Sequence, residues 1–300
     1  MESLTNTTVL ITGINGFTGK HLEAFLKNKG YIVYGTSFSK SKNKNHFKCD
    51  ILNSDEIRNL LAKVQPNYII HLAAISFVAS KDVSNIYVTN VIGTQNLLDA
   101  VVDLQISTDK ILLASSAAIY GNIGSILSEE MCPRPANHYG NSKLAMENIA
   151  ANFFDKLNII ITRPFNYTGV GQEEHFLIPK IVSHFKQKKN TIELGNIDTL
   201  REYNNVGFLI DSYEKLLTSN FHSGAVNIAS GNTHSIKDIL EIMTDISSHS
   251  IRININEKFI RKHEIKELKG SPKKLIKIVG KMTNEYSLKE TLEQMYSSFF

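Results

Sequence analysis

The sequence predicts an α/β protein built on a Rossmann-type, doubly wound parallel sheet, with a smaller C-terminal lobe. Short β-branched apolar runs alternate with amphipathic segments in the first part of the chain, a glycine-rich turn follows the first run, and the alternation loosens after Arg163. Alternating strands and helices produce parallel strands joined by right-handed crossovers. We therefore expect a first domain over residues 1–165 and a lobe over 166–300, a few segments of which return to the first domain.

The first domain is expected to alternate regularly between strands and helices. Thr8–Thr12 is a short apolar run that ends at glycines, which is typical of a buried parallel strand. Residues 21–29 place Leu22, Phe25 and Leu26 at helical spacing. The same reasoning predicts strands over 32–35, 68–72, 110–114 and 159–162, and helices over 54–63, 89–102 and 139–154.

The C-terminal half gives fewer signals. Residues 225–228 are expected to form a late strand and residues 235–246 a helix. Ser235 and Asp238 have the spacing of a capping box, and Ser287 and Glu290 form a second box that opens a C-terminal helix.

Composition argues against several classes of function. The net charge of the 300 residues is +4 and the lysines are scattered, which does not suggest a nucleic-acid partner. The apolar runs are too short to span a bilayer, and the N-terminal residues lack the layout of a secretion signal. Cys49 and Cys132 have no metal-ligand spacing. We expect a cytoplasmic chain with reduced thiols, no metal site and no membrane partner.

A glycine-rich loop follows the first predicted strand. Gly13, Gly16 and Gly19 have the spacing G-x-x-G-x-x-G and open the first helix. Glycines there allow a tight turn and close approach of a pyrophosphate, which the helix N-terminus attracts. The sequence therefore predicts a dinucleotide cofactor, and Asp50, after the presumed third strand, is a candidate contact for its adenine.

The end of the second predicted strand bears on the choice of cofactor. An acidic residue there would bind the ribose 2′-hydroxyl and repel a 2′-phosphate. Residues 36–42 contain hydroxyls and lysines but no acid. This favours NADP(H), while a solvated loop that accepts NAD(H) as well is the alternative.

Tyr139 and Lys143 are the strongest catalytic candidates. They are four residues apart and share one helix face. A tyrosine hydroxyl has an ordinary pKa of about 10, and a nearby ammonium is expected to lower it. Ser116, which follows the fourth long predicted strand, is placed to hydrogen-bond a substrate carbonyl beside Tyr139. We expect reduction with a proton from Tyr139 and hydride from a nicotinamide.

Together these residues resemble the extended short-chain dehydrogenase/reductase family, in particular its nucleotide-sugar branch. The resemblance covers essentially the whole chain and rests on residues 12–19, 71–74, 90–94, 116–121, 139–143 and 163–166. In the second lobe, residues 166–172, 194–196 and 201–203 are most similar to the reductases of GDP-4-keto-6-deoxy-D-mannose that form GDP-D-rhamnose. With the resemblance, the residues expected to bind the cofactor are Gly13, Asn15, Gly16, Phe17, Thr18, Gly19, Ser37, Asp50, Ile51, Leu72, Ala73, Ala74, Tyr139, Lys143 and Pro164.

The resemblance also implies which residues bind substrate in the C-terminal lobe. Besides Ser116, it implies that Asn166 contacts the sugar or diphosphate, that Arg201 clamps the diphosphate and that Glu264 helps to bind the nucleotide. A surface ion pair with Glu202 is the alternative for Arg201.

Two alanines separate this chain from similar enzymes with other chemistry. The nucleotide-sugar 4,6-dehydratases have an Asp-Glu pair where this chain has Ala117 and Ala118, and the 3,5-epimerase/reductases have a cysteine at the position of Ala118. Alanine cannot transfer a proton, so the resemblance implies keto reduction, alcohol oxidation or 4-epimerisation.

The leading hypothesis is therefore an NADP(H)-dependent reductase of a nucleotide-linked 4-keto-6-deoxyhexose, with GDP favoured and dTDP, CDP or UDP as alternatives. A nucleotide-sugar 4-epimerase with tightly bound NAD is the second hypothesis, and a redox-sensing dinucleotide-binding module is the third. The family pairs its helices across a two-fold axis, which implies a homodimer. The helix faces considered for this pairing contain Leu97, Leu98, Val101, Met146, Ile149, Ala150 and Phe153.

Overall fold

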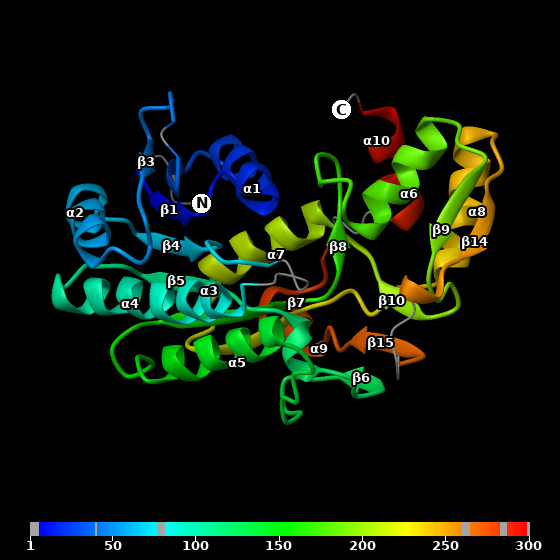
Figure 1. The fold of residues 1–300 in the computed structure, drawn as a ribbon. Helices are drawn as coiled ribbons and strands as arrows, with labels where there is room; N and C mark the ends of the chain where they lie inside the picture. Colours follow the sequence, from blue (N-terminus) through cyan, green and yellow to red (C-terminus); the bar gives the residue numbers. More distant parts are fainter. Residues whose placement is uncertain (1–5, 40, 77–81, 260–264, 283–286, 299–300) are drawn as a thin grey trace.

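A seven-stranded parallel sheet organises the larger part of the protein (Figure 1). The computed structural model describes residues 6–39, 41–76, 82–259, 265–282 and 287–298. The strand order is β12-β7-β5-β4-β1-β2-β3. The bounds are β1 (Thr8–Thr12), β2 (Ile32–Ser37), β3 (His46–Lys48), β4 (Tyr68–His71), β5 (Lys110–Ala114), β7 (Ile159–Pro164) and β12 (Gly224–Ile228).

Helices cover both faces of this sheet, so the predicted doubly wound fold is confirmed. One apolar cluster joins α1 (Phe17–Asn28), α7 (Val206–Thr218) and α9 (Lys273–Val279) to one face. A second cluster joins α2 (Ser54–Val64), α4 (Gly93–Asp103) and α5 (His138–Ala151) to the other. Neighbouring residues of β1 point into different clusters, Val9 into the first and Leu10 into the second, as a strand buried on both faces requires.

A second group of elements lies on the right of Figure 1. An apolar cluster there joins α6 (Leu177–Lys186), α8 (Ile236–Ser247) and α10 (Leu288–Ser297) to the parallel pair β9 (Thr191–Leu194) and β14 (Arg252–Ile255). A small sheet has the order β13-β10-β15-β6, with bounds Thr233–His234, Leu200–Glu202, Glu267–Gly270 and Ser125–Leu127. The short strands β8 (Tyr167–Thr168) and β11 (Asn204–Asn205) pair with each other. Along the chain, β8 directly follows β7 and β11 directly precedes α7.

The helices predicted over 54–63 and 235–246 are correct to within one residue, whereas α5 ends at Ala151, three residues before its predicted end. Both capping boxes, at Ser235 and at Ser287, are present. The first helix begins at Phe17 rather than at residue 21 because the glycine loop already belongs to its start. The helix predicted over 89–102 is preceded by α3 (Val83–Tyr87) and begins as a π-helical turn, Val88–Ile92. Short 3-10 turns occupy Ala117–Tyr120 and Glu257–Phe259.

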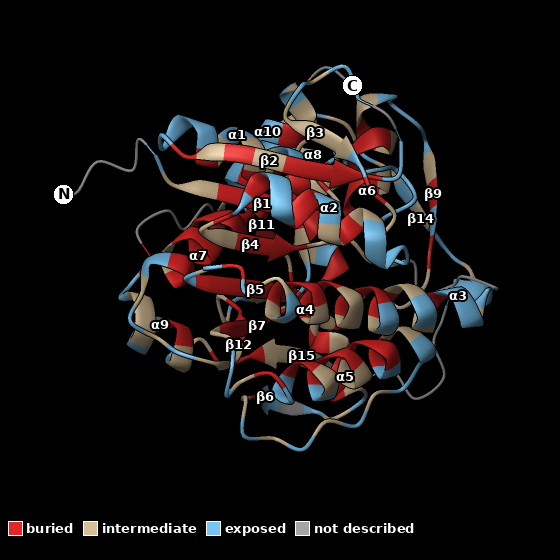
Figure 2. Ribbon diagram, turned by 90° about the vertical axis from the view of Figure 1, so that its left-hand side faces the viewer, coloured by how far each residue is buried: buried red, intermediate tan, exposed pale blue. Residues whose placement is uncertain are grey.

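Helices α6, α7 and α9 were not predicted. Ten of the thirteen residues of α7 are buried, Asp211 and Glu214 among them, so its polar residues do not mark an exposed face. Figure 2 shows the buried residues along the sheet and the inner sides of its helices. In the described part of the chain, no helix is long and apolar enough to cross a membrane. The domain boundary at residue 165 stays a prediction.

Candidate active site

The residues predicted for the site lie mostly along one edge of the main sheet. The sheet is parallel, so the carboxyl ends of its strands meet at this edge, and the strand order changes direction between β1 and β4. This is where a doubly wound sheet forms its ligand crevice. Placed at these strand ends are the loop 13–19 after β1, Ser37 at the end of β2, Asp50 and Ile51 after β3, Leu72, Ala73 and Ala74 after β4, Ser116 after β5, and Pro164 at the end of β7.

The glycine loop has the shape that a pyrophosphate requires. Gly13 has a φ of +72°, and a Cβ there would lie 2.9 Å from the Ala73 nitrogen. A Cβ at Gly19 would lie 2.5 Å from the Ile14 carbonyl oxygen. At Gly16, by contrast, a Cβ would meet only the Gly13 carbonyl oxygen, at 3.3 Å. Gly16 is exposed and is the N-cap residue of α1, and no side chain caps this helix end. A helix start without a side-chain cap fits an anionic cofactor.

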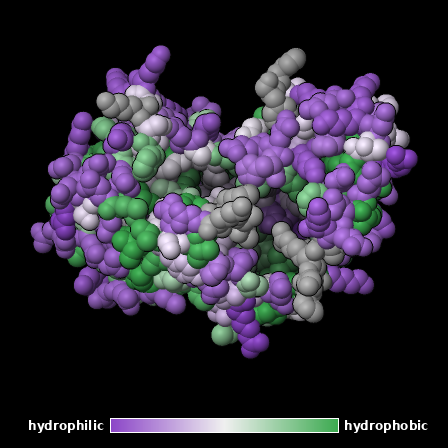
Figure 3. All heavy atoms as spheres, viewed as in Figure 1, coloured by the Kyte–Doolittle hydropathy of each residue, from purple (hydrophilic) through white to green (hydrophobic). Residues whose placement is uncertain are grey.

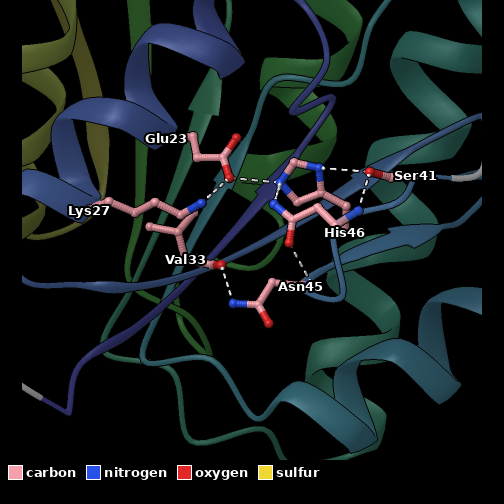
Figure 4. Close-up of polar contacts among 7 residues, drawn as sticks. Glu23, Lys27, Val33, Ser41, Asn45 and His46 are labelled. Atoms are coloured by element: carbon pink, nitrogen blue, oxygen red, sulfur yellow. Dashed lines mark hydrogen bonds and ion pairs between the residues drawn. The ribbon is translucent and has the colours of Figure 1, made fainter.

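The loop after β2 is anchored by a cluster of partly exposed polar side chains (Figure 4). The His46 Nε2 lies 2.7 Å from Glu23 Oε1, and Lys27 Nζ lies 2.5 Å from the same oxygen. Asn45 Nδ2 donates to the Val33 carbonyl over 3.4 Å. Burial raises the pKa of Glu23, but the hydrogen bonds from Lys27 and His46 outweigh this effect and lower it. The carboxylate that borders this loop is thus already paired with two basic side chains.

His71 joins the glycine loop to the helix that contains Asn90. Thr94 donates to the Asn90 carbonyl over 2.9 Å, so its oxygen accepts from His71 Nε2 at 3.0 Å. The opposite ring nitrogen then accepts from the Thr12 hydroxyl at 2.8 Å, and the Thr12 oxygen accepts from the Ala73 N–H at 3.1 Å. The hydrogen-bond network therefore assigns a neutral imidazole with its proton on Nε2. Burial, and next the charge of Lys143, lowers the pKa of His71 to about 3.

Tyr139, Lys143 and Ser116 come together at the end of β5. Lys143 is buried in α5, and Ser116 lies close enough to Tyr139 to lower the pKa of that tyrosine. Lys143 Nζ donates to the Ala114 carbonyl over 2.7 Å. The Ser116 oxygen also accepts from the Ala118 N–H at 3.1 Å, so its own proton remains available for Tyr139. The arrangement has an acid, an ammonium and a hydroxyl donor within one small region.

The expected decrease in the Tyr139 pKa is wrong for the protein without ligands. Burial raises the pKa of Tyr139 to about 12, with a smaller contribution from Tyr167, and the nearby Ser116 hydroxyl only partly offsets this. Burial also lowers the pKa of Lys143 to about 8, while Glu147 acts in the opposite direction. At neutral pH Tyr139 therefore keeps its proton and Lys143 remains largely charged, which suits proton donation.

The π-helical turn brings Asn90 to the catalytic helix. Its buried side chain donates to the Ser142 hydroxyl over 3.0 Å and to the Ile75 carbonyl over 3.1 Å, and accepts from the Ile75 N–H at 2.8 Å. Such turns are frequent at functional sites. Here the turn ties the segment after β4 to α5.

Two of the residues predicted to bind substrate, Asn166 and Arg201, come after β7 in the chain. Asn166 is exposed just after β7, and Arg201 is in β10, where its guanidinium donates to the Leu200 and Ile265 carbonyls over 2.8 and 2.9 Å. Glu202 does not form the surface ion pair considered for Arg201, because it is buried and accepts from the Gly270 N–H at 2.6 Å. Glu264 lies outside the described residues. Figure 3 shows a hollow between the two halves of the molecule.

Sequence reasoning gave no role to Tyr167 and Glu147. The Tyr167 hydroxyl lies 2.8 Å from Thr18 Oγ1, and its ring stacks on Phe17 with centroids 6.1 Å apart. Tyr167 therefore connects the glycine loop to the segment that follows β7. Glu147 follows Lys143 at helical spacing, a signal that was available in the sequence but is common on any helix.

Comparison with known proteins places this arrangement among nucleotide-sugar enzymes. The sequence profile of the family described as GDP-mannose 4,6 dehydratase matches residues 10–295. A GDP-6-deoxy-D-talose 4-dehydrogenase of Aggregatibacter actinomycetemcomitans is 36% identical over 97% of each chain. A GDP-6-deoxy-D-mannose reductase of Pseudomonas aeruginosa is 28% identical over 97% of this chain and 96% of its own.

Two solved structures share the fold over nearly the whole chain. One is a Pseudomonas aeruginosa protein named RMD in complex with NADPH, with a TM-score of 0.86, 28% identity and coverage of 97% and 98%. The other is a UDP-glucuronic acid 4-epimerase of Bacillus cereus in complex with UDP-glucuronic acid and NAD, with a TM-score of 0.86, 26% identity and the same coverage.

Proposed function

Because this chain belongs to the GDP-mannose 4,6 dehydratase family, and is an NAD(P)-dependent oxidoreductase, we propose that it reduces the 4-keto group of GDP-4-keto-6-deoxymannose. The observation that carries the proposal is the meeting of Tyr139, Ser116 and Lys143 beside the uncapped start of α1. The two named relatives both act on GDP-linked 6-deoxyhexoses, and the name of one specifies carbon 4.

The side chains fit a simple reduction. A bound nicotinamide supplies the hydride. Ser116 donates a hydrogen bond to the carbonyl oxygen of the sugar and holds it beside Tyr139. Tyr139, which keeps its proton at neutral pH, transfers it to that oxygen as negative charge develops. The Lys143 ammonium then stabilises the phenolate that remains.

The residues next to Ser116 argue against the elimination reaction in the family's name. Ala117 is buried and Ala118 half-buried in the 3-10 turn after β5, and neither side chain can accept or donate a proton. Loss of water from a sugar needs an acid and a base in addition to hydride transfer. Keto reduction needs only the proton that Tyr139 supplies.

NADPH is the cofactor that the β2–β3 loop favours. The last residues of β2 are Thr36 and Ser37, with no acid to repel a 2′-phosphate. Glu23, which borders the loop, is paired with His46 and Lys27. The complex of the Pseudomonas aeruginosa relative with NADPH agrees with this choice.

The first test is an assay of the purified protein with GDP-4-keto-6-deoxymannose and either NADPH or NADH. We expect rapid loss of reduced-cofactor absorbance, faster with NADPH, and a product whose configuration at carbon 4 NMR identifies as 6-deoxymannose or 6-deoxytalose. Tyr139→Phe should reduce kcat by about 10²–10⁴-fold with NADPH affinity retained. Tyr296→Phe in α10 is the matched control and should behave like wild type.

A 4-epimerase is the second candidate, favoured by the fold shared with the NAD-bound UDP-glucuronic acid 4-epimerase. An epimerase returns its hydride to the sugar and retains its cofactor. Absence of NADPH and NADH oxidation with GDP-, dTDP-, CDP- and UDP-linked keto sugars, together with NAD that copurifies, would favour it over the reductase.

The chain also fits a homodimer, although not through the apolar faces predicted for it. Leu98, Met146 and Ala150 are fully buried against the protomer's own sheet. The outer sides of α4 and α5 lie next to each other in Figure 2. Val88 and Ile92 beside them are 41% and 47% exposed. We propose that two copies pair through this outer surface.

A further inference from the structure

Glu147 is a buried carboxylate that the proposed reaction does not use. Its side chain is 5% exposed and lies one helical turn beyond Lys143. The Ser115 hydroxyl donates to Oε1 over 2.5 Å. The Arg163 guanidinium donates to both oxygens, with Nη2 only 2.6 Å from Oε2. Removal of either partner from such a buried ion pair strongly destabilises a protein, because the other charge is left without compensation.

The contacts of Glu147 reach the catalytic segment through one residue. Lys143 donates a hydrogen bond to the Ala114 carbonyl, and Glu147 accepts one from the Ser115 hydroxyl. Helix α5 is therefore bonded to two successive residues at the end of β5. The Ser115 N–H is fixed from the other side by the Thr162 carbonyl at 2.8 Å. Ser116 follows directly, and its orientation toward Tyr139 depends on this segment.

The charge of Glu147 acts on Lys143 as well. Burial lowers the pKa of Lys143, and Glu147 is the group that raises it. The titratable groups around this lysine include Tyr139 and Glu147 on α5 and His71 at the end of β4, which is held neutral. Arg163 pairs with Glu147 and also donates to the Tyr120 hydroxyl over 2.9 Å, so it is fixed independently of α5.

We propose that Glu147 is a positioning residue that keeps the Lys143 ammonium charged and aligns Ser116 with Tyr139, with Arg163 as its counter-ion. The inference rests on the proposed roles of Tyr139 and Lys143. In this proposal the Glu147 carboxylate does not contact the substrate, but it controls the charge state of Lys143 beside the substrate.

Glu147→Gln tests the proposal because it removes the charge and keeps the shape. With less stabilisation of the ammonium, Lys143 should lose its proton at least one pH unit lower than in wild type. The alkaline limb of kcat should move down by the same amount, which gives roughly a tenfold loss at pH 9 and little loss at pH 6. KM for the nucleotide sugar should change less than kcat, and Glu147→Asp should restore most of the profile.

A second readout needs no turnover. NMR of the ligand-free protein with ¹³C-labelled lysine side chains follows the titration of the buried Lys143 amine directly. Its midpoint should fall in Glu147→Gln. In Arg163→Gln it should rise, because the carboxylate is no longer balanced. This opposite shift tests the proposal even if Glu147→Gln does not fold.

Glu214→Gln is the matched control. Glu214 is a buried glutamate of α7 that accepts from the Tyr31 hydroxyl over 3.2 Å, and its loss should leave the Lys143 midpoint unchanged. An unchanged midpoint in Glu147→Gln, or a loss of kcat that is equal at all pH values, would overturn the inference. Full activity of Tyr139→Phe would instead overturn the proposed function itself.

Discussion

At the scale of single residues, His71 makes the stability of the protein depend on pH. Its folded pKa of about 3 lies well below the value of about 6.5 expected in the unfolded chain. Between these values the unfolded state binds a proton that the native state does not. Stability therefore falls as pH decreases through this window, by about 1.4 kcal/mol per unit once the unfolded histidine is charged.

We predict that lowering the pH from 7 to 5 costs wild type about 2 kcal/mol more unfolding free energy than it costs His71→Gln. Glutamine cannot be protonated in this range, and its amide can still accept from one threonine and donate to the other. Urea unfolding at both pH values measures the difference. His222→Gln, at an exposed position, should keep the wild-type pH dependence, and equal slopes for all three proteins would contradict the prediction.

The structure brings Tyr139, Lys143 and Ser116 together at the end of β5, because helical spacing and strand ends determine where such residues meet. Their proposed roles stay predictions. The direction of the Tyr139 pKa shift could not be read from the sequence, since it depends on burial and on Tyr167, a residue 28 positions away along the chain. The paired carboxylate Glu147 was missed for a similar reason, because Arg163 meets it only in the folded chain.

At the scale of elements, two glycines at the start of α1 have different roles: Gly19 is needed for packing of the backbone, and Gly16 leaves room for a ligand. A methyl group at Gly19 would collide with the backbone of Ile14, whereas at Gly16 it would meet one carbonyl oxygen at 3.3 Å. We predict that Gly16→Ala folds with nearly wild-type Tm but binds NADPH at least about tenfold more weakly, a loss of about 1.4 kcal/mol. Gly19→Ala should lower Tm clearly. Fluorescence titration and thermal unfolding give both values, and unchanged affinity in Gly16→Ala would argue against a cofactor at this helix end.

Several elements with strong local signals were predicted well, although α6 was missed despite the helical spacing of its apolar residues. The β-branched runs, the glycine loop and both capping boxes identify their structures through short-range chemistry. Helix α7 and the short strands β8 and β11 depend instead on tertiary burial and on pairing between distant residues, such as Tyr167 with Asn204. No local periodicity contains that information.

At the scale of the whole molecule, we predict that the protein is a dimer in solution and that Ile92→Asp makes it monomeric at micromolar concentration. The carboxylate would be buried without a partner in the proposed interface. Light scattering measures the mass. Ile276→Asp in α9, at a position with similar exposure, should leave the dimer intact. A wild-type monomer, or a dimer unaffected by Ile92→Asp, would contradict the proposed surface.

The position of β12 has a consequence for how the protein is made. This strand comes from residues 224–228, yet it pairs with β7 in the main sheet, and α7 covers the same sheet. During synthesis the ribosome must therefore release well over two hundred residues before the sheet is complete. A fragment ending at residue 165 would leave one edge of β7 open and the α7 face uncovered, and such a nascent chain would need protection from aggregation until its last strand arrives.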